Sequence, residues 1–349
     1  MIKYPNIMKI LHLSSVIFLI TLSLFLTGCE EIVKEKEEED PGNTDTLKSS
    51  TWMFSDNSGD SWYVYSLEYM DFIKAITSFN PDPYSSIIAA GENGIIIKSE
   101  DGGGTWTVDS TTAGRETINS MSSAGVDLNG VAVGNKGTIL RTQDDGSTWT
   151  VITPPASEDF LSVTFDAFSG IGFATGGNGT LISSPDRGYS WNLIFSNPGS
   201  GIVYRNIAFA TSLYASIIGD SGTVNRAFVL LTVDGGQTWG PAFVPPLDNV
   251  KLYGISFLDS LNGMAVGTGG TILKTTDGGW TWSQRYAFVT DNLFTVVYNS
   301  EVCMAAGNKT VIRSFDLGET WNTSRIDSAN ANLYSIFRLD AGNYFIGGD

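Results

Sequence analysis

Histidine and cysteine are almost absent from this chain of 349 residues. The single histidine is His12, and the two cysteines are Cys29 and Cys303. His12 and Cys29 belong to an N-terminal segment that we expect to be cleaved or modified. The mature chain then keeps one free thiol. This excludes an intramolecular disulfide, a Ser–His or Cys–His catalytic pair and a histidine-ligated metal site, so we expect no metal and no cofactor.

Positive charge is also scarce. The chain has 20 Lys and Arg residues against 37 Asp and Glu residues, which gives a formal net charge of −17 at pH 7. Binding to phosphates requires a basic face, so this balance excludes nucleic acid as the partner. Charged residues make up only 16% of the chain, whereas glycine occurs 39 times. That composition is typical of short strands separated by glycine-containing turns rather than of long helices.

The N-terminus has the features of a secretion signal. Lys3 and Lys9 form a basic region, and residues 11–26 are a largely apolar run, shorter than the roughly 20 residues of a membrane-spanning helix. The Leu-Thr-Gly-Cys sequence that ends at Cys29 resembles the bacterial lipoprotein box, whose cysteine is acylated and becomes the first mature residue. We therefore predict a signal peptide at residues 1–28 and lipidation of Cys29. The alternative is an uncleaved anchor. Both place the rest of the chain outside the cytoplasm, on the periplasmic face of a membrane or at the cell surface.

Residues 29–48 are predicted to be an acidic, disordered tether. The run from Glu30 to Asp40 consists mostly of Glu, Lys and Asp and is followed by Pro41 and Gly42. Such a segment cannot bury enough apolar surface to become ordered. Acidic residues directly after the lipidated cysteine resemble the surface-export signals of some Gram-negative lipoproteins. A plain spacer is the alternative.

A six-residue motif ending in tryptophan recurs along the rest of the chain. Its pattern is Asp-x-Gly-x-Thr/Ser-Trp, and the first copy is weaker because it begins with Asn. Successive tryptophans are 44, 43, 42, 48, 43 and 39 residues apart, and a period near 43 is typical of a four-stranded propeller blade. The copies begin at Asn57, Asp101, Asp144, Asp186, Asp234, Asp277 and Asp316, and they end at Trp62, Trp106, Trp149, Trp191, Trp239, Trp282 and Trp321.

The strands of one repeat can be located in its clearest copy. There, residues 252–257, 263–267 and 271–275 are predicted strands, and an outer strand begins at residue 281. A Gly-x-x-Gly sequence joins the second strand to the third, and glycine there permits positive φ and a close backbone approach. These turns are predicted at Gly91/Gly94, Gly134/Gly137, Gly176/Gly179, Gly219/Gly222 and Gly267/Gly270. No helical pattern follows, which excludes a dinucleotide-binding loop. The 48-residue step predicts a bulge or a lengthened loop within residues 223–231.

The repeated motif is predicted to be structural. Its Asp carboxylate can accept backbone N–H bonds across a tight turn, its Gly can adopt an unusual dihedral, and its Trp can pack against the blade. A catalytic carboxylate would not be repeated in every blade. We therefore expect these aspartates to fasten the blades rather than to react.

Six repeats are complete, and the two ends of the chain supply a seventh. Residues 51–62 align with the outer half of the repeat, and residues 344–349 align with its second strand. We predict an all-β fold over residues 49–349, a seven-bladed propeller with four-stranded blades, whose ring is closed by N- and C-terminal strands that share one blade. Such closure pairs edges that would otherwise be exposed. The alternative is an open array of six blades.

The motif resembles the Asp-box, or BNR, repeat of sialidases and related propellers. Residues 130–142 and 263–279 resemble more closely the photosystem II stability/assembly factor family, and this resemblance covers about residues 50–349. Cyanobacterial members of that family are themselves seven-bladed lipoproteins. The resemblance implies a non-enzymatic activity, the binding and stabilisation of an assembly intermediate of a membrane protein.

Ligands of propellers usually bind around the channel mouth, on the face that carries the loops leading into each inner strand. The Gly-x-x-Gly turns share that face. The four basic residues Lys98, Arg141, Lys274 and Arg313 occupy one third-strand position, which predicts either a partial basic ring or, as we favour, outward-facing solubilising charge. Charges on the loops are either the binding face or merely solvated. The candidates are Arg115, Glu116, Glu158, Asp159, Tyr204, Arg205, Asp248, Lys251, Arg285, Asp291 and Arg325.

Two functions fit these observations. The first is a non-catalytic scaffold, monomeric and membrane-attached only through its lipid, that binds a protein such as a membrane-protein assembly intermediate. The second is a glycan-binding protein or glycoside hydrolase, which would need two carboxylates about 5–10 Å apart. A sialidase is excluded because the Arg-Ile-Pro motif is missing and seven blades are one too many. Tandem-propeller hydrolases place their cleft between two propellers, and this chain holds one, so we favour the scaffold. Carboxylates for the second function could come from Glu116, Glu158, Asp159, Asp248 and Asp291.

We predict that Cys29→Ser abolishes acylation, because the thiol of Cys29 is the acyl acceptor. Metabolic labelling with an alkyne fatty acid should mark the wild type and a Cys303→Ser control equally, and should leave Cys29→Ser unlabelled. Undiminished labelling of Cys29→Ser, or an unlabelled wild type that retains residues 1–28 in its mass spectrum, would contradict lipidation.

Overall fold

The computed structural model describes residues 50–55, 58, 63–67, 72–80, 86–109, 116–125, 127–222, 226–324, 331–339 and 342–349. All of them fall within one unit, residues 48–349. The predicted signal peptide, the lipidation site Cys29, the acidic tether and the motif residues Asn57 and Trp62 lie outside the described residues. Within these described ranges, no helix has the length and apolar character needed to cross a membrane.

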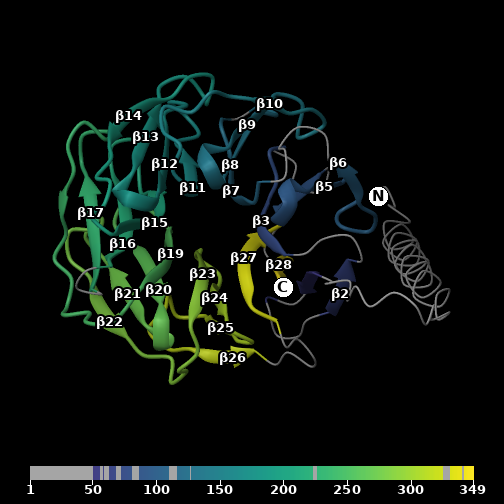
Figure 1. Ribbon diagram of the computed structural model, residues 1–349. Helices are drawn as coiled ribbons and strands as arrows, with labels where there is room; N and C mark the ends of the chain where they lie inside the picture. Colours follow the sequence, from purple (N-terminus) through teal and green to yellow (C-terminus); the bar gives the residue numbers. More distant parts are fainter. Residues whose placement is uncertain are drawn as a thin grey trace, which may run out of the picture. The chain divides into compact units, whose positions relative to one another are not determined.

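Seven antiparallel, four-stranded sheets form the blades of a propeller (Figure 1). In blades 1–6 the strands follow one another along the sequence from the channel outward. Blade 1 contains β3 (Ile73–Thr77), β4 (Ile87–Gly91), β5 (Ile96–Ser99) and β6 (Thr107–Asp109). Blade 2 contains β7 (Ile118–Ser123), β8 (Gly130–Gly134), β9 (Ile139–Thr142) and β10 (Thr150–Val151). Blade 3 contains β11 (Phe160–Phe165), β12 (Gly172–Gly176), β13 (Leu181–Ser184) and β14 (Asn192–Phe195). Blade 4 contains β15 (Ile202–Phe209), β16 (Ala215–Ser221), β17 (Arg226–Thr232) and β18 (Gly240–Pro241). Blade 5 contains β19 (Leu252–Phe257), β20 (Gly263–Gly267), β21 (Ile272–Thr275) and β22 (Ser283–Arg285). Blade 6 contains β23 (Leu293–Tyr298), β24 (Cys303–Gly307), β25 (Val311–Ser314) and β26 (Asn322–Ser324).

Blade 7 combines the two ends of the chain. It contains β27 (Leu333–Arg338) and β28 (Tyr344–Gly348) from the C-terminal part, and β1 (Ser50–Ser55) and β2 (Tyr63–Leu67) from the N-terminal part. β1 pairs antiparallel with β28, with Met53 opposite Ile346, and β27 contacts β3 of blade 1. The predicted all-β, seven-bladed fold with one shared blade is therefore confirmed, and the open six-bladed alternative is wrong.

The apolar core lies between neighbouring blades. Between blades 1 and 2, Ile88, Ile118 and Leu140 are fully buried, and Trp149 packs edge-on against Phe79 with ring centroids 5.8 Å apart. Truncating a buried Trp or Phe to Ala typically costs about 3–5 kcal/mol. Equivalent clusters fill the other blade interfaces, so the tryptophans of the repeated motif hold successive blades together.

The repeated motif forms a hydrogen-bonded hairpin between the third and fourth strands, which we call the Asp-box hairpin. In blade 6, Oδ1 of Asp316 accepts bonds from the Thr320 amide (2.8 Å) and the Ser314 hydroxyl (2.7 Å), while Oδ2 accepts the Thr320 hydroxyl (2.6 Å). The Ser314 hydroxyl in turn accepts the Gly318 amide at 2.8 Å. The hydroxyl two residues before the Asp was not singled out from the sequence, yet six described hairpins share it. These hydroxyls belong to Ser99, Thr142, Ser184, Thr232, Thr275 and Ser314.

The four basic residues at the shared third-strand position lie between blades. Arg141 and Lys274 are 3% and 6% exposed, and the side chain of Lys98 is 11% exposed. Each donates to, or forms an ion pair with, the Asp-box hairpin of the following blade. The expectation of outward-facing solubilising charge is therefore wrong, because these side chains lie against fixed polar partners, as buried cations require.

Blade 4 differs from the other blades in the length of its strands. The residues that lengthen this repeat extend the antiparallel pairing between its second and third strands. β16 and β17 therefore pair over seven positions, and Gly219 lies inside β16, opposite Tyr204 and Phe228. The expected Gly-x-x-Gly turn at Gly219 is thus wrong, as is the bulge, and a longer hairpin takes its place. Continued pairing satisfies backbone N–H and C=O groups that a loop would leave to solvent.

The hydrogen bonds of the Asp-box hairpin predict an acid-sensitive fold. The Thr320 hydroxyl, the Thr320 amide and the Ser314 hydroxyl lower the pKa of Asp316 from 3.8 to about 2. A depressed folded-state pKa stabilises the fold above the unfolded pKa, and this contribution is lost as the pH falls from about 4 to about 2. We therefore expect Asp316→Asn to unfold at lower urea concentration at pH 7 and to lose less stability between pH 4 and pH 2 than the wild type. Exposed Asp248→Asn serves as the control and should behave like the wild type. Parallel pH profiles for Asp316→Asn and the wild type would contradict this.

Candidate functional site

The Gly-x-x-Gly turns define one face of the propeller because each is tied to the start of an inner strand. In blade 2, the amide of Asn135 donates to the carbonyl of Thr117 at 3.0 Å. A Cβ on Gly134 would lie 2.1 Å from that carbonyl oxygen, and Gly137 has a φ of 75°, so both glycines are required. Four such turns contain short 3-10 helices: η1 (Glu92–Gly94), η2 (Asn135–Gly137), η3 (Gly177–Gly179) and η4 (Thr268–Gly270). The inner strands therefore begin on this face, which we call the GxxG face, and the Asp-box hairpins lie on the opposite face.

Every inner strand carries a β-bulge near its start on the GxxG face. At each bulge the pairing with the second strand skips one residue. A bulge leaves the extra residue unpaired and turns its side chain away from the regular alternation. The seven skipped residues are all half-buried and lie one per blade around the channel. They are Lys74, Asn119, Leu161, Arg205, Tyr253, Phe294 and Tyr334.

Five of these residues form one continuous row, which we call the mouth arc. Lys74 Nζ lies 3.8 Å from the ring centroid of Tyr334, whose ring stacks on Phe294 at 5.3 Å. Phe294 meets Tyr253 edge-on at 5.2 Å, and the guanidinium carbon of Arg205 lies 5.2 Å from the Tyr253 ring centroid. Three aromatic rings from blades 7, 6 and 5 are therefore bracketed by two cations from blades 1 and 4.

Carboxylates face both cations of the mouth arc. Burial lowers the pKa of Lys74, against the opposing effect of the charges of Glu92 and Asp349. Burial, together with the charge of Asp349, raises the pKa of Tyr334 to about 12, and the Tyr334 hydroxyl donates to Asp349 at 3.4 Å. Arg205 forms an ion pair with Asp220, which is 2% exposed. The arc is thus an aromatic surface whose charges are already balanced.

Most of the predicted candidates on the GxxG face fix the loops that lead into the inner strands. Lys136 Nζ forms an ion pair with Glu116 at 2.8 Å, and the backbone amide of Lys136 donates to the Asp159 carboxylate at 2.9 Å. Glu158 accepts a bond from the Asn178 amide group at 2.9 Å. The remaining described candidates are tied in similar ways. Asp291 accepts the Thr310 hydroxyl at 2.7 Å, the Lys251 amide donates to Thr268 at 3.1 Å, and exposed Asp248 lies 3.8 Å from Arg226.

Two predicted candidates do not belong to this face, and two others lie outside the described residues. Tyr204 is 8% exposed and packs between Phe195 and Phe228, because its place in β15 points it into the core. Arg285 lies on the outer strand β22 and pairs with Glu319 of the next Asp-box hairpin at 3.1 Å. Arg115 and Arg325 are the two outside the described part of the chain.

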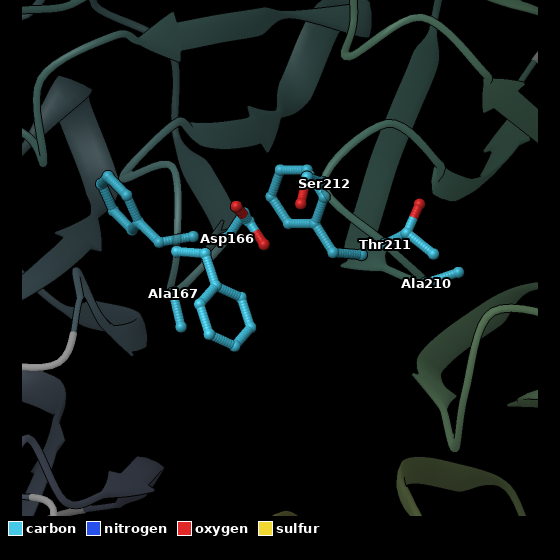
Figure 2. Close-up of a pocket in the computed structure, with 8 residues that line it drawn as sticks. Asp166, Ala167, Ala210, Thr211 and Ser212 are labelled. Atoms are coloured by element: carbon cyan, nitrogen blue, oxygen red, sulfur yellow. The ribbon is translucent and has the colours of Figure 1, made fainter.

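Outside the mouth arc, the described residues include one buried thiol and a hollow on the opposite face. No three His, Cys, Asp or Glu side chains among them gather as a metal site. Burial raises the pKa of the Cys303 thiol to about 12, which keeps it protonated and unreactive near neutral pH. A hollow of about 400 Å³ lies on the opposite face, between the loops after β11 and β15 (Figure 2). Of the residues that line it, Asp166 alone is titratable, and Phe168 is 87% exposed.

No family model matches the sequence, and no curated protein matches it. Solved structures resemble the fold. The structure of YCF48 from Cyanidioschyzon merolae gives a TM-score of 0.63 at 18% identity, covering 80% of this chain and 93% of that chain. YCF48 bound to D1 peptide gives 0.64 at 18% identity, covering 88% and 96%. The GH74 xyloglucanase from Xanthomonas campestris gives 0.58 at 14% identity, covering 78% of this chain and 46% of that chain. At these identities the likeness establishes a seven-bladed propeller similar to that of YCF48.

We expect Arg205→Met to lower the stability of the fold, and not only to change the surface of the mouth arc. The substitution leaves Asp220 buried without its cation, and removing one partner of a buried pair typically costs about 3 kcal/mol or more. Urea unfolding should show the loss, and the double variant Arg205→Met/Asp220→Asn should recover part of it. Equal stability of Arg205→Met and the wild type would show that the pair is not structural.

Proposed function

We propose that this chain is a non-catalytic, protein-binding propeller that holds a segment of a partner protein on its GxxG face, against the mouth arc. The observation that carries this proposal is the continuous row of three aromatic rings between two cations, contributed by five different blades. Aromatic and arginine side chains dominate binding energy at protein interfaces, and aromatic rings do so at a low cost in conformational entropy. A rigid inner strand supports each ring, so the surface is preorganised.

The charge balance of the arc favours a mainly uncharged segment. Lys74 faces Glu92 and Asp349, and Arg205 faces Asp220. A strongly anionic or cationic ligand would have to displace these partners. Apolar, aromatic or proline side chains can stack on Tyr253, Phe294 and Tyr334 without disturbing them.

The carboxylates of this face support the non-enzymatic proposal. A glycoside hydrolase needs one carboxylate to donate a proton and a second to attack or to activate water. Here Glu116 and Asp159 are both bonded to Lys136, and Asp291 to the Thr310 hydroxyl. Each contact fixes a loop that leads into an inner strand: Asp159 is held to blade 2, and Asp291 is held within its own blade 6. Holding these loops is a sufficient reason for the residues. The glycan-active alternative stays a prediction that no described contact favours.

The likeness to solved propellers supports a peptide-like ligand. One similar structure is described as YCF48 bound to D1 peptide, and its fold matches 88% of this chain. We further propose that the propeller works as a monomer outside the cytoplasm, attached to a membrane through lipidated Cys29. Its partner would then be a membrane protein, or an assembly intermediate of one, within reach of the tether.

We expect a photo-crosslinking phenylalanine analogue at Phe294 or Tyr334 to capture one and the same partner in cells that make the protein. The same analogue at Phe315 is the matched control, because Phe315 is 58% exposed and lies next to the Asp-box motif on the other face. Phe294→Ala should weaken the captured complex about tenfold or more, and Phe315→Ala should not. Capture that is equal from both faces, or absent from the arc positions, would contradict the proposal.

A further inference from the structure

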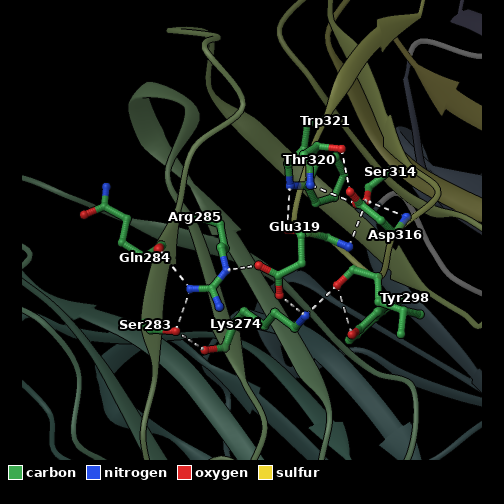
Figure 3. Close-up of polar contacts among 12 residues, drawn as sticks. Lys274, Ser283, Gln284, Arg285, Tyr298, Ser314, Asp316, Glu319, Thr320 and Trp321 are labelled. Carbon is green, nitrogen blue, oxygen red and sulfur yellow. Dashed lines mark hydrogen bonds and ion pairs between the residues drawn. The ribbon is translucent and has the colours of Figure 1, made fainter.

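Neighbouring blades are fastened by a cation at one recurring position. In blade 5, Lys274 lies opposite Met264 on the third strand, and its side chain is 7% exposed. Its Nζ donates to the carbonyl of Leu317 at 2.8 Å and to the carboxylate of Glu319 at 2.6 Å (Figure 3). Leu317 and Glu319 are the second and fourth residues of the Asp-box motif in blade 6. We call such a contact a blade joint.

The other joints that contain a cation use the same acceptor positions. Arg141 donates to the carbonyl of Arg187, the second motif residue, at 3.0 Å, and stacks at 3.5 Å on the ring of Tyr189, the fourth. Lys98 Nζ lies 3.1 Å from the Ser147 hydroxyl, again the fourth motif residue. The second and fourth residues therefore form a receptor for a basic side chain, and this molecule fills that receptor repeatedly.

The joint between blades 3 and 4 has the receptor but no cation. Ser183 lies opposite Phe173, the register position that Lys274 occupies in blade 5, and its side chain is too short to cross. Gly235 and Gln237 are the second and fourth motif residues of blade 4. A hollow of about 280 Å³ lies where the cation lies in the joints that contain one. It is lined by Ser183, Asn192, Ile194, Gly235, Gly236 and Gln237.

The two other joints without a cation are filled with apolar side chains or backbone. Between blades 7 and 1 the position holds Phe54, which packs against Phe345 with centroids 5.1 Å apart. Between blades 4 and 5 it holds Leu231, and the chain after β18 crosses the joint. There the amide of Phe243 donates to Trp280 at 2.8 Å, and the amide of Trp282 donates to Phe243 at 2.9 Å. Among the described joints, the one between blades 3 and 4 therefore has both a small residue at the cation position, Ser183, and a hollow beside it.

We infer that the blade 3–blade 4 joint binds a lysine or arginine side chain of a partner protein, in the position that Lys274 and Arg141 occupy in their own joints. The Gln237 Nε2 group donates to the Asp234 carbonyl at 3.1 Å, which directs the amide oxygen to accept from the incoming cation together with the Gly235 carbonyl. Ile194, which is 40% exposed, offers an apolar wall to the aliphatic stem. The net charge of −17 attracts a basic partner. This site is separate from the mouth arc and does not depend on the function proposed for it.

The test uses the mature full-length chain and the peptide acetyl-Gly-Gly-Arg-Gly-Gly-amide. Its control peptide carries citrulline, which is close to arginine in shape but uncharged, in place of Arg. We expect the arginine peptide to shift the NMR amide signals of Gly235, Gly236 and Gln237 in a saturable way. The citrulline peptide should bind at least about tenfold more weakly, because hydrogen bonds from a charged donor are stronger than those from a neutral one. Equal binding of the two peptides, or no shift at these residues, would overturn the inference.

Two substitutions separate this site from the rest of the molecule. Ser183→Arg supplies the missing cation from within the chain and should abolish the peptide-induced shifts, whereas Ser300→Arg adds the same charge to an exposed loop of blade 6 and should not. Gln237→Ala removes an exposed acceptor without touching the core and should weaken binding severalfold. Undiminished binding in Ser183→Arg or in Gln237→Ala would overturn the inference. Phe294→Ala should leave this titration unchanged, so failure here and failure at the mouth arc give different results.

Discussion

The carboxylate of the Asp-box hairpin, held between two hydroxyls and a backbone amide, is the contact on which the rest of the structure depends. In blade 6 it fixes the turn through Ser314 and Thr320. The fixed turn sets Trp321 into the interface between blades, where it is 9% exposed, with its indole N–H donating to Gly318 at 3.2 Å. It also presents the Leu317 carbonyl to Lys274 of the preceding blade. One local interaction therefore determines the hairpin, the core packing and the fastening between blades.

The architecture could be predicted from the sequence because its determinants are local and repeated. Tryptophans spaced about 43 residues apart gave the number and size of the blades, and the half-repeats at the two ends gave the shared blade, which the pairing of Met53 with Ile346 confirms. The blade joints could not be predicted in the same way. In the sequence, a basic residue on a strand gives no sign of whether it faces solvent or the next blade. The contact between Lys274 and the Leu317 carbonyl shows that this residue faces the next blade. In blade 4, the extra residues within 223–231 were expected to form a bulge or a lengthened loop, but β16 and β17 instead pair over a longer stretch.

The candidate site was harder to predict because it depends on bulges. Residues 252–257 read as an unbroken alternating strand, which gives no sign that Tyr253 is skipped in the pairing. Of the five residues in the mouth arc, Arg205 alone was among the sequence candidates. The signal that could have found the others is the lysine or aromatic side chain at the second position of the inner strands, as in Lys74, Tyr253, Phe294 and Tyr334. Most of the predicted loop charges instead fix the loops of this face to nearby turns and strands, as Asp291 does with Thr310, because a charge lowers its free energy by pairing.

In the proposed function, a segment of the partner protein lies on the mouth arc of the GxxG face. Hydrogen–deuterium exchange of the propeller with and without its captured partner tests this most directly. We expect added protection where inner strands begin, in residues 73–75, 252–254, 293–295 and 333–335, and no change in the Asp-box hairpins at residues 277–282 and 316–321. Protection confined to those hairpins, with the starts of the inner strands exchanging as in the free protein, would contradict it.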